Sequence, residues 1–196
     1  MNRIITIGRE FGSGGREIGR RLSEELQIAY YDQEIITKVA NCTRLSEEYI
    51  QRISERRHFI AFPIHIGHSF YPVTDPMIQN GVLVFAEQHR LLEELSKKSD
   101  CIIVGRCADY LLQNKADCLK VFIHADMAFR AKRIVEVYGE REQSPEQRLR
   151  DKDKRRAAYH RFYTDMKWGD ARNYHIALDS GALGIDKCAD MIASLY

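Results

Sequence analysis

A glycine-rich stretch near the start of the chain has residue types and spacing suited to binding phosphate. Residues 8–17 read GREFGSGGRE and follow a short β-branched run, residues 4–7. Glycines let the backbone turn tightly, so that several N–H groups face one anion, and the helix that follows adds a partial positive charge. We therefore predict a phosphate-binding loop made by Gly12, Ser13, Gly14, Gly15, Arg16 and Glu17.

The loop departs from the full phosphate-binding motif, G-x-x-x-x-G-K-[ST], because no lysine follows its glycines. Alignment on the helix places Gly15 at the lysine position. An alignment that allows one extra residue in the loop instead places Arg16 at the lysine position and Glu17 at the Ser/Thr position. Arg16 could then bind the terminal phosphates as a planar fork, and Glu17 could ligate Mg²⁺ directly or through water. The alternative is a glycine-rich turn from strand to helix that binds no ligand.

Charged residues at other expected element ends are further candidates. Asp32 ends an apolar run and could bind the substrate, or could instead cap the helix that follows. Arg106 follows a buried run and is expected to bind a substrate phosphate, the alternative being a structural salt bridge. Residues 148–156 contain six basic and two acidic side chains, among which Asp153 and Arg156 share a helix face. The alternative for this cluster is a solvated helix face.

Short apolar runs that alternate with amphipathic stretches must position these side chains. This alternation predicts βαβ units and an α/β fold, with about five parallel strands between two layers of helices. Ligands of such sheets bind beyond the carboxyl ends of the strands. Strands are expected at about 4–7, 28–31, 101–105, 119–123 and 174–179, and the clearest helices at about 16–26, 81–97, 126–139, 145–165 and 185–195.

Local signals indicate where some elements begin. Asn80 could cap the helix that starts at Gly81, and Asp126 is expected to cap the helix that ends at Gly139. Residues from about 57 to 80 contain three of the four prolines and are expected to form an irregular insertion. The sequence leaves open whether that insertion makes a dimer contact or covers the substrate.

Composition limits the classes of function. The 196 residues suit a single domain, and a net charge of +2 gives no global case for binding nucleic acid or membranes. The five cysteines include no C-x-x-C pair, so we expect reduced thiols in a cytoplasmic protein. No apolar run is long enough to span a membrane. The histidines and cysteines show no spacing typical of a structural metal site.

Four segments, in this order along the chain, resemble motifs of cytidylate kinases. The strand end 103–106 (IVGR) resembles the family's glycine–arginine, and 129–133 (FRAKR) resembles its E-R-A-x-R helix. Residues 150–157 (RDKDKRRA) resemble the stretch R-D-x-D-x-x-R-A, and 171–180 resemble the closing strand D-A-x-x-x-x-D-[ST]. The similarity spans roughly residues 3–192 and is most specific for the branch of cytidylate kinase-like proteins.

The resemblance implies a P-loop kinase that transfers the γ-phosphoryl group of ATP, with Mg²⁺, to a nucleoside monophosphate, CMP or dCMP favoured. It implies one domain over 1–196, with an acceptor-binding insertion at about 38–97 and a lid at about 139–165. Arg16, Arg133 and Arg156 would be catalytic. The acceptor would be held by Lys38, Arg106, Arg150, Asp153 and Arg156, together with Asp32 at its strand end.

Two departures from the family's motifs, and two alternative functions, are also to be considered. Cys107 stands where the family has an aspartate, and Gly81 stands where an arginine is expected; both positions would touch the acceptor. A degenerate loop could serve a sensor that binds a nucleotide without turning it over. A nucleic-acid binder would need a wider basic surface than the net charge suggests. We expect a nucleotide donor and a small-molecule acceptor as partners, without nucleic acid or membrane.

Overall fold

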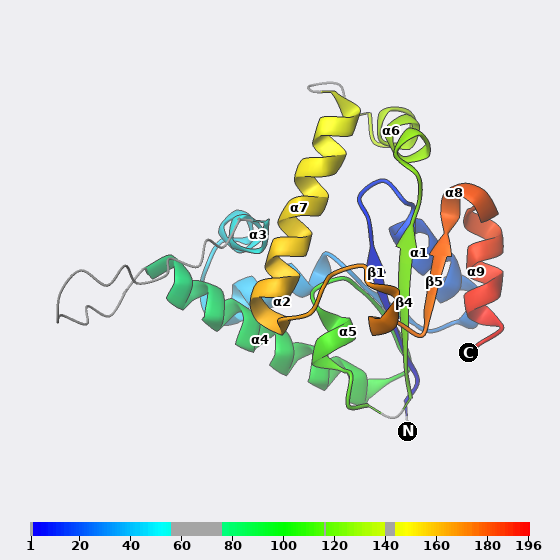
Figure 1. Ribbon diagram of the computed structural model, residues 1–196. Coiled ribbons are helices and arrows are strands. Elements are labelled where there is room, and N and C mark those ends of the chain that lie inside the picture. The colour runs from blue at the N-terminus through cyan, green and yellow to red at the C-terminus, as the bar shows by residue number, and fades with distance from the viewer. Residues whose placement is uncertain (1, 56–75, 116, 140–143) are drawn as a thin grey trace.

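A five-stranded parallel sheet forms the centre of the protein (Figure 1). The computed structural model describes residues 2–55, 76–115, 117–139 and 144–196. The strands lie in the order β2-β3-β1-β4-β5, and every neighbouring pair is parallel. This confirms the predicted sheet. The bounds are β1 Ile4–Arg9, β2 Ala29–Tyr31, β3 Cys101–Val104, β4 Cys118–His124 and β5 Ile176–Asp179.

Helices cover both faces of the sheet, which gives the three αβα layers that the sequence predicts. The turns α5 and α8 and one 3₁₀ turn were not predicted, because four residues or fewer cannot show a helical period. The bounds are α1 Gly15–Leu26, α2 Glu34–Thr43, α3 Glu47–Glu55, α4 Pro76–Lys98, α5 Ala108–Leu111, α6 Met127–Glu136, α7 Pro145–Thr164, the 3₁₀ turn Ala171–Asn173, α8 Ser180–Leu183 and α9 Ile185–Ala193.

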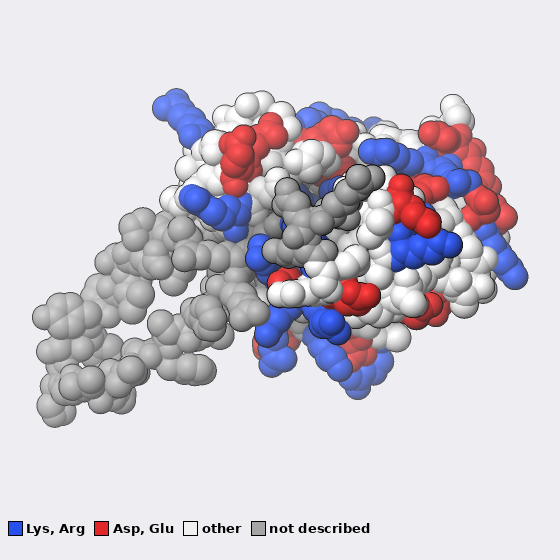
Figure 2. All heavy atoms as spheres, turned by 90° about the horizontal axis from the view of Figure 1, so that it is seen from above, with Lys and Arg blue, Asp and Glu red and all other residues white. Residues whose placement is uncertain are grey.

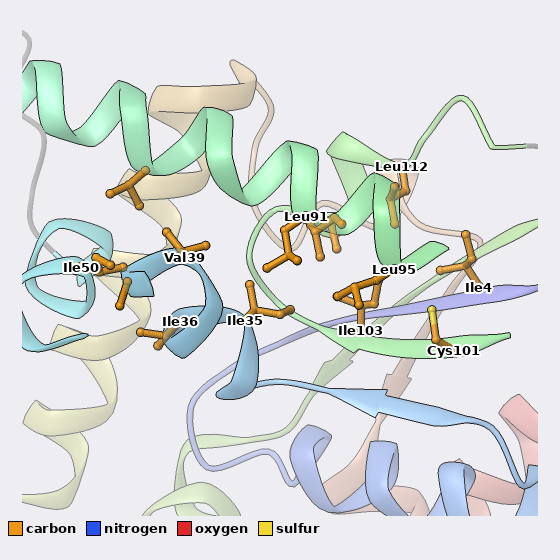
Figure 3. Packing of buried hydrophobic residues seen from close by; sticks show 14 of the residues in the cluster. Ile4, Ile35, Ile36, Val39, Ile50, Leu91, Leu95, Cys101, Ile103 and Leu112 are labelled. Atoms are coloured by element: carbon orange, nitrogen blue, oxygen red, sulfur yellow. The ribbon is translucent and has the colours of Figure 1, made fainter. Parts of the chain in front are cut away.

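The alternation of side chains along the strands divides the core in two. Ile5 and Ile7 of β1 pack with α1 and α9 on one face. Ile4 of β1 and Ile103 of β3 pack on the other face, against α2, α4 and α5 (Figure 3). Both strands are buried on both faces, as their continuous apolar sequence predicts for a parallel sheet. The core therefore fixes the central strand whose carboxyl end carries the glycine-rich loop.

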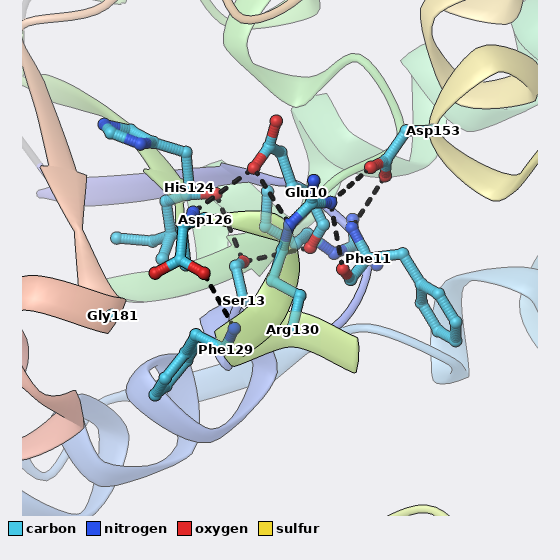
Figure 4. Close-up of polar contacts among 12 residues, drawn as sticks. Glu10, Phe11, Ser13, His124, Asp126, Phe129, Arg130, Asp153 and Gly181 are labelled. Carbon is cyan, nitrogen blue, oxygen red and sulfur yellow. Dashed lines mark hydrogen bonds and ion pairs between the residues drawn. The ribbon is translucent and has the colours of Figure 1, made fainter. Parts of the chain in front are cut away.

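The first residues of α6 and α4 test the two N-caps that the sequence predicts. Asp126 caps α6, accepting the backbone N–H of Phe129 at 2.8 Å, as predicted (Figure 4). The predicted cap at Asn80 is wrong, because α4 already begins at Pro76. Proline suits the first turn of a helix, where its missing N–H has no partner to lose. Asn80 lies within α4, and its side chain donates to the Tyr49 hydroxyl at 3.1 Å.

The predicted insertion at 57–80 lies mainly outside the described residues, and its last five residues belong to α4. Within the described segments, every helix is too short or too polar to span a lipid bilayer. Figure 1 places α6 and the start of α7 beyond the carboxyl ends of β1 and β4, the end of a parallel sheet at which ligands bind.

Candidate functional site

The glycine-rich loop joins β1 to α1 at the carboxyl edge of the central strand, where its sequence places it. Two of its glycines have φ values of 80° and 81°, a left-handed conformation that favours glycine. The buried Ser13 hydroxyl donates to the carbonyls of Glu10 (2.9 Å) and Ile123 (3.2 Å), and Ser180 donates to the Ser13 carbonyl at 2.6 Å. The loop is thus held in one shape by β4 and α8.

A buried arginine joins this loop to the helices above it. Arg130 of α6 contacts Asp153 of α7 at 2.5 Å, the Phe11 carbonyl at 3.3 Å and the Glu10 carboxylate at 3.4 Å (Figure 4). Asp153 also accepts the Phe11 N–H at 2.7 Å, so both carboxylate oxygens are bonded. The predicted contact of Asp153 with the acceptor stays a prediction, and this geometry shows a link between the loop and α7.

We expect Asp153→Asn to destabilise the protein. Asparagine keeps an oxygen for the Phe11 N–H but removes the charge that faces Arg130, whose side chain is 7% exposed. Losing a charged hydrogen bond at such a site costs roughly 1.5–3 kcal/mol. Urea unfolding measures the loss, and Asp151→Asn on the same helix is the control. Equal stability of the two variants would contradict the link.

Arg9, the last residue of β1, places its guanidinium at the middle of the carboxyl edge. Its side chain is 13% exposed, and Nη2 lies 3.5 Å from Asp32 Oδ1. Burial and the like charge of Arg156 lower the pKa of Arg9 to about 9, an effect to which Arg16 and Arg106 add and which Asp32 opposes. Sequence reasoning missed this residue, although an arginine that ends a strand and opens a glycine loop is a usable signal.

Two glycines make the room that Arg9 occupies. A Cβ on Gly105 would lie 1.8 Å from Arg9 Nη1, and a Cβ on Gly15 would lie 2.7 Å from Arg9 Cβ. Real Cβ atoms essentially never come so close to another heavy atom. Gly15 and Gly105 therefore leave room for the Arg9 side chain, in addition to their effect on the backbone conformation.

Asp32 directly follows the last residue of β2 and faces two arginines. Its carboxylate is bonded to Arg16 Nε at 2.6 Å in addition to the contact with Arg9. The alternative role as a helix cap is wrong, because the N-cap of α2 is Gln33. Asp32 is therefore a buried counter-ion at the site.

The turn after β3 has an unusual backbone. Gly105, Arg106 and Cys107 have successive φ values of 76°, 58° and 53°. Left-handed geometry costs residues other than glycine roughly 1–2 kcal/mol each, and such strain clusters at functional sites. Here it directs Arg106 to the carboxyl edge, where the sequence predicts it to bind substrate.

Two cavities open side by side at this edge. The first, of about 250 Å³, runs along the loop and is lined by Arg9, Glu10, Phe11, Gly12, Gly14, Gly15, Arg16, Tyr138 and Arg156. The second, of about 100 Å³, is lined by Gly8, Arg9, Arg16, Gln33, Gln51, Gly105, Arg106, Cys107, Asp109, Arg156, Tyr159, His160 and Trp168. Three arginines, Arg9, Arg16 and Arg156, line both.

The lining of the second cavity includes a carboxylate in a fixed position, that of Asp109. Asp109 Oδ2 lies 2.9 Å from His160 Nε2, and both side chains are buried. The Thr164 hydroxyl lies 3.1 Å from the other ring nitrogen of His160. Sequence reasoning missed this pair, since α5 and α7 bring together residues 51 positions apart.

Glu17 is bonded to two arginines in this structure. It pairs with Arg133 of α6, and its other oxygen accepts from Arg21 at 2.9 Å. These hydrogen bonds lower the pKa of Glu17, although its partial burial acts in the opposite direction. The predicted role of Glu17 as a magnesium ligand would require it to leave at least one of these partners.

Two predicted acceptor ligands lie away from both cavities. Lys38 is exposed on α2, with its ammonium 5.6 Å from the centre of the Tyr31 ring. Arg150 is exposed on α7. Their roles stay predictions, and the four arginines at positions 9, 16, 106 and 156 are the ones that the fold gathers at the cavities.

The surface around the cavities carries both signs of charge. Figure 2 looks onto the carboxyl end of the sheet, where basic and acidic side chains are interspersed over the described residues. A nucleic-acid binder would present a wider basic surface, so this face gives that alternative no support. Among the described residues, no group of three or more His, Cys, Asp or Glu side chains is arranged to hold a metal.

Residues 4–182 match the model of the cytidylate kinase-like family. A solved structure of an uncharacterized protein from Eubacterium ventriosum ATCC 27560 is 28% identical, with a TM-score of 0.73 and coverage of 99% of this chain and 98% of that chain. The comparison with curated proteins found no match.

Two solved kinases share the fold at lower identity. A gluconokinase from Sinorhizobium meliloti 1021 is 16% identical, with a TM-score of 0.57 over 98% of this chain and 93% of that chain. Shikimate kinase from Acinetobacter baumannii, in complex with shikimate, is also 16% identical, with a TM-score of 0.55 over 100% and 92%. These similarities confirm the predicted P-loop kinase fold.

Proposed function

The chain belongs to the cytidylate kinase-like family, and from that premise we propose that it transfers the γ-phosphoryl group of ATP to a nucleoside monophosphate, with CMP or dCMP favoured, or to a similar small acceptor. The observation that carries the proposal is that the two neighbouring cavities share three lining arginines, which form the boundary between them. Phosphoryl transfer requires donor and acceptor to meet in line, with positive charge around the oxygens of the transferred group.

The donor fits the larger cavity. Its wall is the loop, whose backbone N–H groups and helix N-terminus favour polyphosphate. The acceptor fits the smaller cavity, in which Arg106 would bind the acceptor phosphate as a fork. Asp109, which is held by His160, would accept a hydrogen bond from an N–H or O–H group of the acceptor.

The boundary between the cavities is where the reaction would occur. An oxygen of the acceptor phosphate attacks the γ-phosphorus, the bond to the bridging oxygen breaks, and the electron pair stays on ADP. Arg16 and Arg156 line both cavities and would stabilise charge on the transferred group. No general base is needed, because a phosphate oxygen is already an adequate nucleophile.

The residues present fit a magnesium ion carried in with ATP. Mg²⁺ keeps most of its waters and binds through one or two carboxylates plus substrate phosphates. Among the described residues that line the larger cavity, Glu10 is the one carboxylate, and its contacts with Ala125 and Arg130 both use Oε2. Glu10 is thus better placed than Glu17 to hold the ion, directly or through water. When bound, the ion neutralises charge on the β- and γ-phosphates.

A sensor that binds a nucleotide without transfer is the second candidate. The observation in its favour is the loop without lysine, next to which Arg133 is paired with Glu17. For this candidate, ATP would stabilise the protein against heat, and no acceptor would be phosphorylated.

A coupled assay of ADP release tests the proposal. The protein is given ATP, Mg²⁺ and, in turn, each of the common ribo- and deoxyribonucleoside monophosphates, with shikimate and gluconate as non-nucleotide acceptors. We expect release that depends on one class of monophosphate, cytidine nucleotides first. ADP release at the same rate without acceptor would contradict transfer, and release with a non-nucleotide acceptor would redirect the assignment.

A further inference from the structure

We propose that Arg9 is a catalytic residue that takes the place of the lysine missing from the glycine-rich loop and binds the phosphoryl group as it passes between the two cavities. The proposal rests on the phosphoryl transfer proposed above and adds a residue that the motif does not contain. Three observations support it, namely the position of Arg9, the charge around it and the engagement of the other arginines.

The position of Arg9 is central to the site. It ends β1, which lies in the middle of the sheet between β3 and β4, and it lines both cavities. A loop lysine would approach the phosphates from the first turn of α1. Gly15 stands in that turn, and a Cβ there would lie 2.7 Å from Arg9 Cβ. The space that a larger side chain at position 15 would need is therefore filled by Arg9, entering from the strand.

The charges of the described residues that act most strongly on Arg9 favour an anion. Arg156, Arg16 and Arg106 act on it with like charge, and the carboxylate of Asp32 opposes them. Of the carboxylates in the cavity walls, Glu10 contacts Arg130 and Asp109 contacts His160. Buried like charges are costly unless a counter-charge arrives. A polyphosphate, or two phosphates end to end, supplies that counter-charge.

The other arginines of the site contact different groups from those that Arg9 contacts. Arg16 has a side chain that is 49% exposed and bonded to Asp32 at 2.6 Å. The Arg156 guanidinium lies 5.4 Å from the centre of the Phe11 ring and donates to the Arg9 carbonyl at 3.3 Å. Arg133 is paired with Glu17. Arg9 combines burial with a long 3.5 Å contact to its counter-ion, which a phosphate oxygen can replace.

The test compares Arg9→Met and Arg9→Lys with wild type, and Arg20→Met, an exposed arginine on α1, is the control. We expect Arg9→Met to lower kcat by roughly 100- to 1,000-fold, the usual loss when one charge-stabilising donor is removed. Arg9→Lys should recover part of kcat because it retains the charge. The KM for the acceptor should change much less than kcat, since Arg106 still binds its phosphate.

A double variant separates catalysis from simple neutralisation of Asp32. If Arg9 only balances that carboxylate, Arg9→Met together with Asp32→Asn should regain the kcat of Asp32→Asn alone. We expect no such recovery. A recovered double variant, or an Arg9→Met variant with wild-type kcat, would overturn the proposal.

Calorimetric binding of inorganic tripolyphosphate keeps this test independent of the acceptor. We expect Arg9→Met to bind it at least 10-fold more weakly than wild type, while Arg20→Met is unchanged. If wild type phosphorylates no acceptor, the proposed function fails, and the same titration still decides whether Arg9 binds phosphate. Equal affinity of Arg9→Met and wild type would overturn the assignment in either case.

Discussion

Replacing Gly105 with alanine is expected to remove most phosphoryl transfer while the protein stays folded. The new methyl group would overlap Arg9 Nη1, at 1.8 Å. That atom is the end of a flexible side chain, so the guanidinium can move and the backbone need not. The cation then leaves the boundary of the two cavities.

The size of this effect combines two physical causes. Misplacing a charge that stabilises the transferred group costs roughly 100-fold or more in kcat. The positive φ of 76° adds roughly 1–2 kcal/mol of backbone strain for alanine. Gly139→Ala is the matched control, because Gly139 has a φ of 68° and a methyl there would meet nothing within 4 Å. Both variants should lose similar stability, and a similar loss of kcat would contradict the explanation.

Removing the Arg106 side chain is expected to have the second large effect. Arg106→Ala should lower kcat/KM for the acceptor by roughly 100- to 1,000-fold, about 2.7–4 kcal/mol of transition-state stabilisation. The KM for ATP should change little, because Arg106 lines the smaller cavity and not the larger one. Steady-state kinetics with each substrate varied in turn measures both effects.

The control for this variant is an arginine that lies outside the cavities. Arg172 has an 88% exposed side chain and bonds Asp170 beside it, so Arg172→Ala should retain wild-type kinetics. If Arg106→Ala instead raised the KM for ATP and left acceptor kinetics intact, the assignment of the two cavities would have to be reversed.

Much of the fold could be predicted from local patterns. The five strands are short apolar runs bounded by polar or glycine residues, and Asp126 caps its helix as its position indicates. The glycine loop is likewise local, because strand, turn and helix follow one another in sequence. The helix α4 was predicted, but its start at Pro76 was missed, since proline, which is common in turns, also fits the first turn of a helix.

The parts of the site that were missed depend on contacts between distant segments. The position of Arg9 depends on Gly105 and Gly15, which leave room for its side chain and are distant from each other in sequence. Asp109 and His160 lie on separate helices, and no spacing rule pairs them. Asp153 was predicted to face the acceptor, and its bonds to Arg130 and the loop depend on how α6 meets α7.

Phosphoryl transfer between the two cavities is tested directly by ³¹P NMR of ATP and Mg²⁺ incubated with the protein and CMP, and then with the other nucleoside monophosphates. We expect the γ-phosphate signal of ATP to disappear while signals of ADP and of the acceptor diphosphate grow together. Unchanged ATP with every monophosphate, in a protein that ATP stabilises against heat, would contradict transfer between the two cavities and favour the sensor.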